Sequence, residues 1–144
     1  MKSTDEIWNE VIHHICQIDF PSNNQNLNKA YLVFQYYSEL ESGGHEAWLN
    51  WWHEYIDEVG IGTYIKELTD ILEKINAQDY AVILQKYGED MWRTFIALEK
   101  GGGMDEDSFY QVIEKADQDY YTLEDKLQQL LESYFVSNHT DYIE

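Results

Sequence analysis

The sequence predicts an all-α protein, and three of its features lead to that prediction. Apolar residues recur at helical spacing along most of the chain, and glycine residues separate the apolar stretches. No segment shows the sustained alternation of apolar and polar residues that is typical of a strand. The chain has 144 residues, a length typical of one domain. We therefore expect a single compact domain of six to eight helices over residues 1–144.

The first helix is expected to begin at Ser3. Ser3-Thr4-Asp5-Glu6 has the pattern of a capping box, in which the first and last side chains each bind a free backbone N–H of the first turn. Apolar residues then continue at helical spacing to Ile18, just before Phe20-Pro21. Because residues 22–26 are all polar, we expect a loop there, so residues 1–25 form an N-terminal helix and loop.

Two further helices are expected on either side of Gly43 and Gly44. Residues 27–41 are apolar nearly all round, which is typical of a buried central helix, and Asn28 belongs to its narrow polar stripe. Glycine ends helices because it adopts the left-handed conformation at little steric cost. A helix over residues 45–59 would then have an apolar face formed by His45, Trp48, Trp52, Tyr55, Ile56 and Val59.

Shorter helices are expected in the middle of the chain. Gly60 and Gly62 are expected to end the helix over residues 45–59, and Thr63 is expected to cap the next one. Two short helices should follow, over residues 77–87 and 90–99.

The last part of the chain begins with a glycine hinge at residues 101–103. Apolar residues then stay in helical phase over residues 107–136. This pattern permits one long helix, or two helices if the capping pattern in residues 122–125 starts a second one.

The net charge of the chain limits which classes of ligand are expected. With 28 acidic and 9 basic residues, the formal net charge is −19, which excludes nucleic acid as an expected ligand. The net charge is −8 over residues 1–58, −2 over residues 59–100 and −9 over residues 101–144. A domain of this size is about 37 Å across, and duplex DNA carries roughly 22 phosphates over that length. The protein therefore has enough negative charge to imitate a polyanion.

Acidic residues without a neighbouring cation are the candidates for a partner-binding surface. On a single helix over residues 107–136, three of these candidates, Glu114, Asp125 and Glu132, would lie along one solvent face. Trp51 lies at the edge of its helix's apolar face. Its side chain is expected either to contact a partner or to be a partly covered core residue. The candidate acids are Glu46, Glu54, Asp57, Glu58, Glu114, Asp125 and Glu132.

The sequence contains no pattern of a catalytic, cofactor or metal site. It lacks metal-ligand spacings, a nucleophile elbow and a phosphate-binding glycine loop, so neither a cofactor nor a metal is expected. Cys16 lies beside Ile15, where we expect a packed thiol. His45 lies on an apolar face, where a hydrogen-bonded core or cap histidine is the favoured reading over a ligand.

The segment Tyr31-Leu-Val-Phe-Gln-Tyr-Tyr-Ser-Glu-Leu-Glu-Ser-Gly-Gly-His-Glu-Ala-Trp-Leu-Asn-Trp51 resembles a helix, glycine turn and aromatic helix of a bacterial all-helical family. The resemblance extends over residues 27–135, and its core is Gly43-Gly44-His45, with Trp48 in the aromatic helix. Most members of that family have no known function, and one is an acidic DNA mimic. The resemblance implies an all-α fold and, for the characterised member, binding as a dimer to the DNA-reading surface of a transcription factor. It does not imply an enzyme, and we expect a non-enzymatic protein for which a homodimer is one option.

Three functions remain as alternatives. The first is a DNA mimic that occupies the basic site of a nucleic-acid-binding protein. The second is an antitoxin-like or immunity-like module that binds its partner through the aromatic surface at Trp51, with acidity serving only solubility. The third is a metal-dependent enzyme that uses carboxylates with His45 or His53. We expect a cytoplasmic protein without a membrane partner, because the sequence shows neither a secretory signal nor a membrane-spanning stretch.

Overall fold

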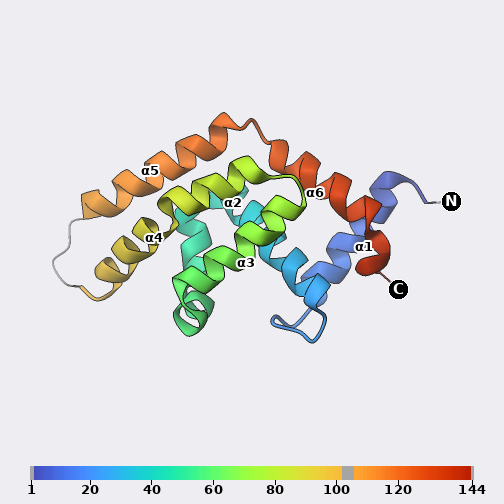
Figure 1. Ribbon diagram of the computed structural model, residues 1–144, viewed down its shortest axis with the longest axis horizontal. Helices are drawn as coiled ribbons and strands as arrows, with labels where there is room; N and C mark the ends of the chain where they lie inside the picture. The colour runs from blue at the N-terminus through green and yellow to red at the C-terminus, as the bar shows by residue number, and fades with distance from the viewer. Residues whose placement is uncertain (1, 102–105, 144) are drawn as a thin grey trace.

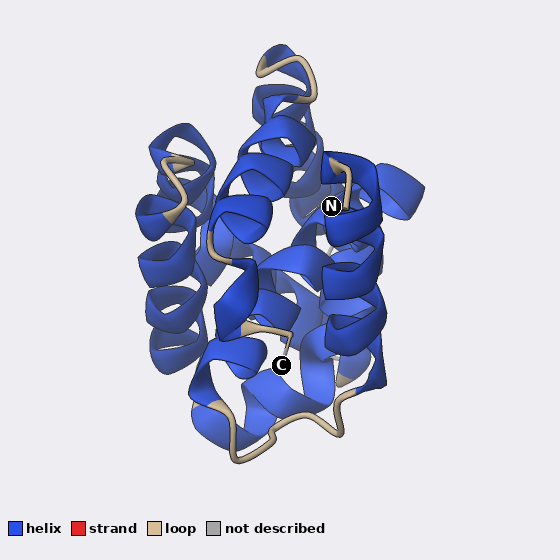
Figure 2. Cartoon of the chain, turned by 90° about the vertical axis from the view of Figure 1, so that its right-hand side faces the viewer, coloured by secondary structure: helices blue, strands red, loops and turns tan. Residues whose placement is uncertain are grey.

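The computed structural model describes residues 2–101 and 106–143, and it confirms the all-α fold of one compact domain (Figure 2). No strand occurs in this described part of the chain, and none of its helices is long and apolar enough to cross a membrane. The helices are α1 (Thr4–Gln17), α2 (Gln25–Val59), α3 (Ile61–Lys74), α4 (Gln78–Glu99), α5 (Glu106–Thr122), α6 (Lys126–Ser137) and the short 3-10 helix η1 (His139–Asp141).

Helix α2 is the central element of the fold. It packs against α1, α3, α5 and α6. Helices α3 and α4 pack against each other, and α5 packs along α4 (Figure 1). Because α6 returns to pack against α1, the two ends of the chain lie on the same side of the molecule (Figure 1).

Aromatic side chains make up much of the core. Several of them carry a polar group, and that group has a partner inside the core. The indole Nε1 of Trp48 donates a hydrogen bond to the Tyr64 hydroxyl at 2.8 Å, and the Leu127 N–H donates to the Tyr80 hydroxyl at 3.0 Å. These bonds pair the polar groups of large amphipathic rings inside the core, whereas the buried Trp52 Nε1 has no hydrogen-bond partner among the described residues. The fully buried aromatic residues include Tyr36, Trp48, Tyr64, Tyr80, Phe109, Tyr120 and Phe135.

The start of α1 confirms the predicted capping box. The Glu6 N–H donates to Ser3 Oγ at 3.2 Å, and the Ser3 N–H donates to Glu6 Oε1 at 3.4 Å. Val11 and Ile15 are fully buried. The expectation of a packed Cys16 thiol is wrong, because the next position on the helix is rotated by about 100° from Ile15 and lies exposed.

The predicted break between the two helical halves of α2 lies at the predicted residues. The two helices follow each other directly over residues 25–59, but the backbone of Gly43 (φ −157°, ψ 18°) and Gly44 (φ 71°, ψ −164°) between them is not helical. α2 is therefore two helices joined by a kink with no intervening loop. The polar stripe predicted for the first half is wrong at Asn28, which is buried and hydrogen-bonded to Ser22.

Two predictions for the middle of the chain are wrong. Helix α3 begins at Ile61 with Gly60 as its N-cap, so Thr63 lies inside the helix instead of capping it. Residues 78–99 form the single helix α4, where two short helices were predicted. Gly88 continues this helix because α3 packs closely on it: a Cβ atom at Gly88 would lie 2.7 Å from Ile65 Cδ1.

The C-terminal part contains two helices. Glu124 (φ 58°) and Asp125 (φ 60°) have left-handed backbone conformations, which end one helix before the next begins at Lys126. The restart does not use the predicted capping pattern, because Thr122 Oγ1 donates to the Gln118 carbonyl oxygen and Asp125 makes no capping bond. Of the predicted hinge, Gly101 has φ 62°, and residues 102–103 lie outside the described part.

Candidate interaction surface

Hydrogen bonds between His45 and Asp117 connect the kink of α2 to α5. The His45 backbone N–H donates to Asp117 Oδ1 at 2.9 Å, and His45 Nδ1 lies 2.7 Å from the same oxygen. The carboxylate thus binds an otherwise free N–H at the start of the second half of α2, the place where negative charge is most favourable. A Cβ atom on Gly44 would lie 2.6 Å from Asp117 Oδ2, so only glycine leaves room for this approach.

The hydrogen bonds around His45 determine its tautomer. A carboxylate can only accept, so Nδ1 carries the proton, and Nε2 accepts from the Tyr36 hydroxyl at 2.9 Å. The side chain is fully buried, and burial lowers the pKa of His45 below its ordinary value, while the hydrogen bond and charge of Asp117 act in the opposite direction. His45 is therefore a neutral core residue at pH 7, which favours the predicted role of a core and cap histidine.

Tyrosine hydroxyl groups hold several carboxylates of this protein. Near the kink, Tyr110 donates to Glu46 Oε2 at 3.0 Å and Tyr120 donates to Glu41 Oε2 at 3.2 Å. Elsewhere, Tyr55 donates to Glu67 and Tyr87 donates to Asp119, each at 2.9 Å. A hydrogen bond from a neutral phenol orients a carboxylate without cancelling its charge.

Three of these phenols, Tyr55, Tyr110 and Tyr120, have raised pKa values. The hydrogen bond with Glu46 raises the pKa of Tyr110, and burial is the main cause that raises the pKa of Tyr120. Burial followed by the bond with Glu67 raises the pKa of Tyr55 to about 12. These three hydroxyl groups therefore remain neutral donors at pH 7.

Five carboxylates gather where the kink of α2 meets α5, and we call this group the kink-side surface. Glu41 and Asp125 both raise the pKa of Tyr37 and Tyr80, after burial as the largest cause. Asp117 and Glu114 line one open hollow with Gln118, Tyr121 and Thr122. The kink-side surface consists of Glu41, Glu46, Glu114, Asp117 and Asp125.

The kink-side surface keeps its charge because basic side chains do not pair with it. The lysine and arginine ion pairs of the described residues are Lys2–Glu10, Lys66–Asp70 and Arg93–Asp90, and each of them lies elsewhere. The only histidine, lysine or arginine bound to one of its carboxylates within that part of the chain is His45, which is neutral and hydrogen-bonded to Asp117. The surface is therefore a set of carboxylates without salt bridges to any lysine or arginine that the structure describes, and three of them, Glu41, Glu46 and Asp117, are oriented by hydrogen bonds.

The structure places the predicted acids in three regions. Glu46, Glu114 and Asp125 belong to the kink-side surface. Glu54, Asp57 and Glu58 lie in the last turns of α2, which runs away from α5 (Figure 1). All three are exposed, and we call them the far acidic group.

Glu132 lies apart from both groups. Its side chain lines a hollow with Thr4 at the start of α1. The predicted alignment of Glu114, Asp125 and Glu132 on one helical face is therefore wrong, because the left-handed residues before Lys126 separate α5 from α6.

Trp51 is exposed, with 53% of its surface accessible to solvent, whereas Trp48 and Trp52 are buried as predicted. Other large apolar side chains with substantial exposure are Val82, Tyr110 and Tyr121. Trp51 therefore lies on the surface of the chain, where a partner could reach it.

Sequence reasoning missed two residues of the kink-side surface, Glu41 and Asp117. Glu41 precedes the glycine pair, a position that suggested only the end of a helix. Asp117 lies 72 positions from His45, so no local spacing links the two. The position of His45 directly after Gly44 is the one sequence signal, because the first N–H groups of a new helix require acceptors.

The metal-dependent alternative concerned carboxylates together with His45 or His53. No group of three or more histidine, cysteine, aspartate or glutamate side chains in residues 2–101 and 106–143 is placed to hold a metal ion. His45 uses both ring nitrogens in the core, and His53 is exposed with Nδ1 donating to the Asn50 carbonyl oxygen at 2.9 Å.

Comparisons with known proteins give one match. Searches of curated protein sequences and of solved structures find nothing that matches the chain. The family described as DMP19-like protein matches residues 23–139, a range that includes the whole segment 27–135 over which a family resemblance was predicted. Since this range covers most of the 144 residues, the chain belongs to the DMP19-like protein family.

Proposed function

We propose that this protein is a non-enzymatic interaction domain that imitates a polyanion and occupies the basic site of a nucleic-acid-binding protein. The observation that carries the proposal is the kink-side surface, in which tyrosine hydroxyls position Glu41 and Glu46 and the His45 backbone N–H positions Asp117. Charge fixed before binding favours association, because less side-chain freedom is lost when the partner docks.

The location of the charge supports this proposal further. Residues 59–100, which include all of α3 and α4, have a net charge of only −2, whereas the segments on either side of them have −8 and −9. The kink of α2 and helix α5 come from these two flanking segments, and the fold brings them together (Figure 1). A basic partner would therefore meet the strongest negative potential at the contact between α2 and α5.

Affinity capture at two salt concentrations tests the proposal. The tagged protein is incubated with extract of its native cells at about 50 mM and about 300 mM salt, a range over which electrostatic association weakens steeply. We expect retained proteins that bind DNA, that are lost at high salt, and that the free protein displaces from duplex DNA in a competition assay. Retention unchanged by salt, or a partner that binds DNA and this protein simultaneously, would contradict mimicry.

Two charge-matched triple variants locate the binding surface. The variant E46Q/E114Q/D125N removes three charges from the kink-side surface and leaves the structural residue Asp117 in place. The control E54Q/D57N/E58Q removes three charges from the far acidic group. We expect the first variant to lose at least tenfold in affinity for the captured partner and the second to lose less than threefold, since close charges contribute most. The reverse order would place the binding surface at the end of α2.

A second candidate function rests on Trp51. A half-exposed tryptophan on a helix is the kind of residue that dominates protein interfaces, which favours a binding module that uses shape and apolar contact. If this function holds, Trp51→Ala abolishes partner binding while both triple charge variants bind normally. Val82→Ala serves as the control, because Val82 is equally exposed at 54%.

A further inference from the structure

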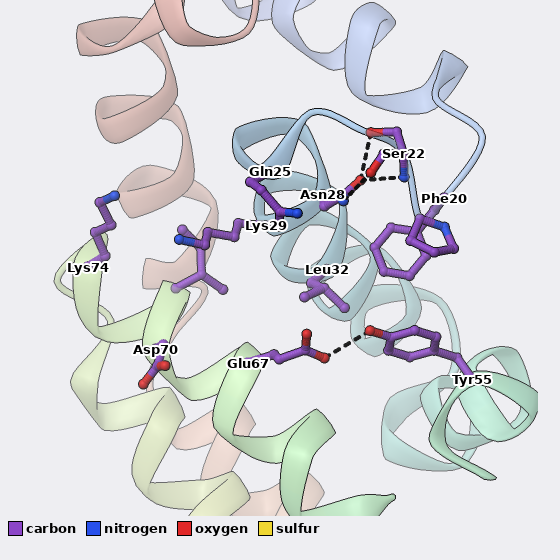
Figure 3. A pocket seen from close by; sticks show the side chains of 12 residues that line it. Phe20, Ser22, Gln25, Asn28, Lys29, Leu32, Tyr55, Glu67, Asp70 and Lys74 are labelled. Carbon is purple, nitrogen blue, oxygen red and sulfur yellow. Dashed lines mark hydrogen bonds between the residues drawn. The ribbon is translucent and has the colours of Figure 1, made fainter. Parts of the chain in front are cut away.

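A groove lies between the first half of α2, helix α3 and the segment that joins α1 to α2 (Figure 3). Its volume is about 350 Å³, at the lower end of the range for ligand pockets, about 300–1,000 Å³. The kink-side surface contributes no side chain to it. The residues that matter for its chemistry are Phe20, Lys29, Leu32, Tyr55, Glu67 and Lys74.

The wall formed by the connecting segment is held in place. Asn28 is buried, and its Oδ1 accepts hydrogen bonds from both the N–H and the hydroxyl of Ser22 at 2.8 Å, while its Nδ2 donates to the Ser22 carbonyl oxygen at 2.8 Å. Phe20 packs edge-on against Tyr55 and Trp52, with ring centroids 5.1 and 5.4 Å apart. The groove is therefore formed before any ligand arrives.

Glu67 provides one negative group inside the groove. Its side chain extends from α3 towards Tyr55, whose hydroxyl donates to Oε1 at 2.9 Å (Figure 3). The other carboxylate oxygen receives no hydrogen bond from the described residues and points into the groove (Figure 3). It can therefore accept a hydrogen bond from a ligand.

Two ammonium groups lie at the other end of the groove. Lys29 extends from α2 towards α3, on the side where Lys74 stands (Figure 3). Within the part of the chain that the structure describes, neither lysine forms an ion pair, and the nearby Asp70 pairs with Lys66. In a protein with a net charge of −19, two unpaired lysines beside one groove favour the binding of an anionic group there.

We propose that this groove binds a free α-amino acid with an apolar side chain. The α-carboxylate lies between Lys29 and Lys74, the ammonium group donates to the free oxygen of Glu67, and the apolar side chain packs towards Leu32, Phe20 and Tyr55 (Figure 3). Along the groove the two lysines are followed by Glu67 and then by the aromatic rings, which matches the order of groups in such a ligand, and Asp70, a second carboxylate of the lining, is paired with Lys66. The volume suits one amino acid, and the single pair of cations does not suit a nucleotide with several phosphates. This site does not depend on the proposed function at the kink-side surface.

Titration of the full-length protein with three probes tests the site. L-phenylalanine has all three groups, N-acetyl-L-phenylalanine lacks the ammonium group, and 2-phenylethylamine lacks the carboxylate. We expect saturable binding of L-phenylalanine by calorimetry, with amide shifts in the NMR spectrum at residues that line the groove. The other two probes should bind at least tenfold more weakly, because each leaves one charged group of the groove unpaired. Absence of saturation up to about 10 mM, or equal affinity for all three probes, would overturn the proposal.

Variants of the lining charges assign each contact. Glu67→Gln should lower the affinity for L-phenylalanine about tenfold and leave the affinity for N-acetyl-L-phenylalanine unchanged, since only the first ligand carries an ammonium group. The double variant K29Q/K74Q should lower the affinity for both probes that carry a carboxylate by about tenfold or more. Lys86→Gln is the matched control, because Lys86 is an exposed lysine of α4 that is absent from the groove lining and leaves the Lys66–Asp70 ion pair in place. If the groove variants bind all three probes like the unaltered protein, the ligand binds elsewhere and the proposal fails.

Discussion

The kink-side surface and the far acidic group belong to the same protein and share helix α2, but their carboxylates are held differently. Glu46, at the kink, accepts a hydrogen bond from Tyr110 of α5, and Asp117 binds the backbone and ring of His45. Glu54, Asp57 and Glu58 are exposed in the last turns of α2. The comparison shows that formal charge and organised charge are different properties: similar residues become a fixed surface only where a second helix supplies donors.

The largest expected effect concerns the glycine that makes the kink. Gly44→Ala introduces a Cβ atom 2.6 Å from Asp117 Oδ2 at a φ of 71°, so both the backbone conformation and the contact with α5 are strained. We expect the free energy of unfolding to fall by about 3 kcal/mol or more, measured by chemical denaturation.

Gly60→Ala is the matched control for that substitution. Gly60 also has a positive φ, 92°, but a Cβ atom there meets nothing within 4 Å. Gly60→Ala should therefore lower the unfolding free energy only through backbone strain, by about 1–2 kcal/mol. Equal losses in the two variants would mean that the contact of α5 with the kink contributes nothing.

The next effect concerns the carboxylate that fastens α5 to the kink. Asp117→Ala leaves both the His45 N–H and Nδ1 without their acceptor, and we expect a loss of about 2 kcal/mol in unfolding free energy. The same substitution at Asp57, in the far acidic group, should change stability by less than about 0.5 kcal/mol. If Asp117→Ala also changed the unfolding free energy by less than about 0.5 kcal/mol, the carboxylate at the kink would be no more important for stability than those of the far acidic group.

A smaller effect is expected from pH, because His45 titrates differently in the folded and unfolded chains. Burial is the main cause that lowers its folded pKa below the unfolded value of 6.5, so the unfolded chain binds more protons as the pH falls below 6.5. The stability that comes from neutral His45 is therefore present above pH 6.5 and is lost as the pH falls towards the folded pKa.

His45→Asn isolates this contribution. The difference in unfolding free energy between the unaltered protein and His45→Asn should shrink between pH 7.5 and pH 5.5. Using a difference removes the general effect of protonating surface carboxylates, which both proteins share. A difference that stays constant or grows over that range would contradict the assignment of a buried, neutral His45.

The smallest expected effect concerns the orientation of a single carboxylate. Tyr110→Phe removes the donor to Glu46 while leaving every charge in place. We expect an unchanged melting temperature and about a threefold loss of affinity for the basic partner, because Glu46 must then be ordered during binding. Tyr121→Phe is the control, since Tyr121 is exposed in the same region and its hydroxyl binds no carboxylate among the described residues. Equal affinities for both variants would show that orientation of Glu46 has no effect on binding.

Local patterns in the sequence predicted the helices well where one residue dominates the local energetics. The Ser3 capping box and the Gly43-Gly44 break are both present, because capping and positive φ are decided by neighbours within a few positions. The prediction of two short helices failed at Gly88, whose intrinsic helix penalty of about 1 kcal/mol is outweighed by the close packing of α3 on α4.

The candidate surface could be predicted only in part. Charge counting singled out Glu46, Glu114 and Asp125 but also Glu132, which lies beside α1. It could not single out Asp117, since the interaction of a carboxylate with an N–H group 72 residues away depends on how α5 packs on α2. Tertiary packing also decided which acids receive tyrosine donors.

The sequence by itself therefore determined the all-helical fold, the place of the kink and the amount of negative charge, because periodicity, glycine and composition act locally or as sums over the chain. Only the tertiary structure decided which carboxylates are oriented, that His45 is a neutral core residue, and that Lys29 and Lys74 line one groove with Glu67. These properties depend on distances between residues far apart in the chain, and such distances are set by how the helices pack.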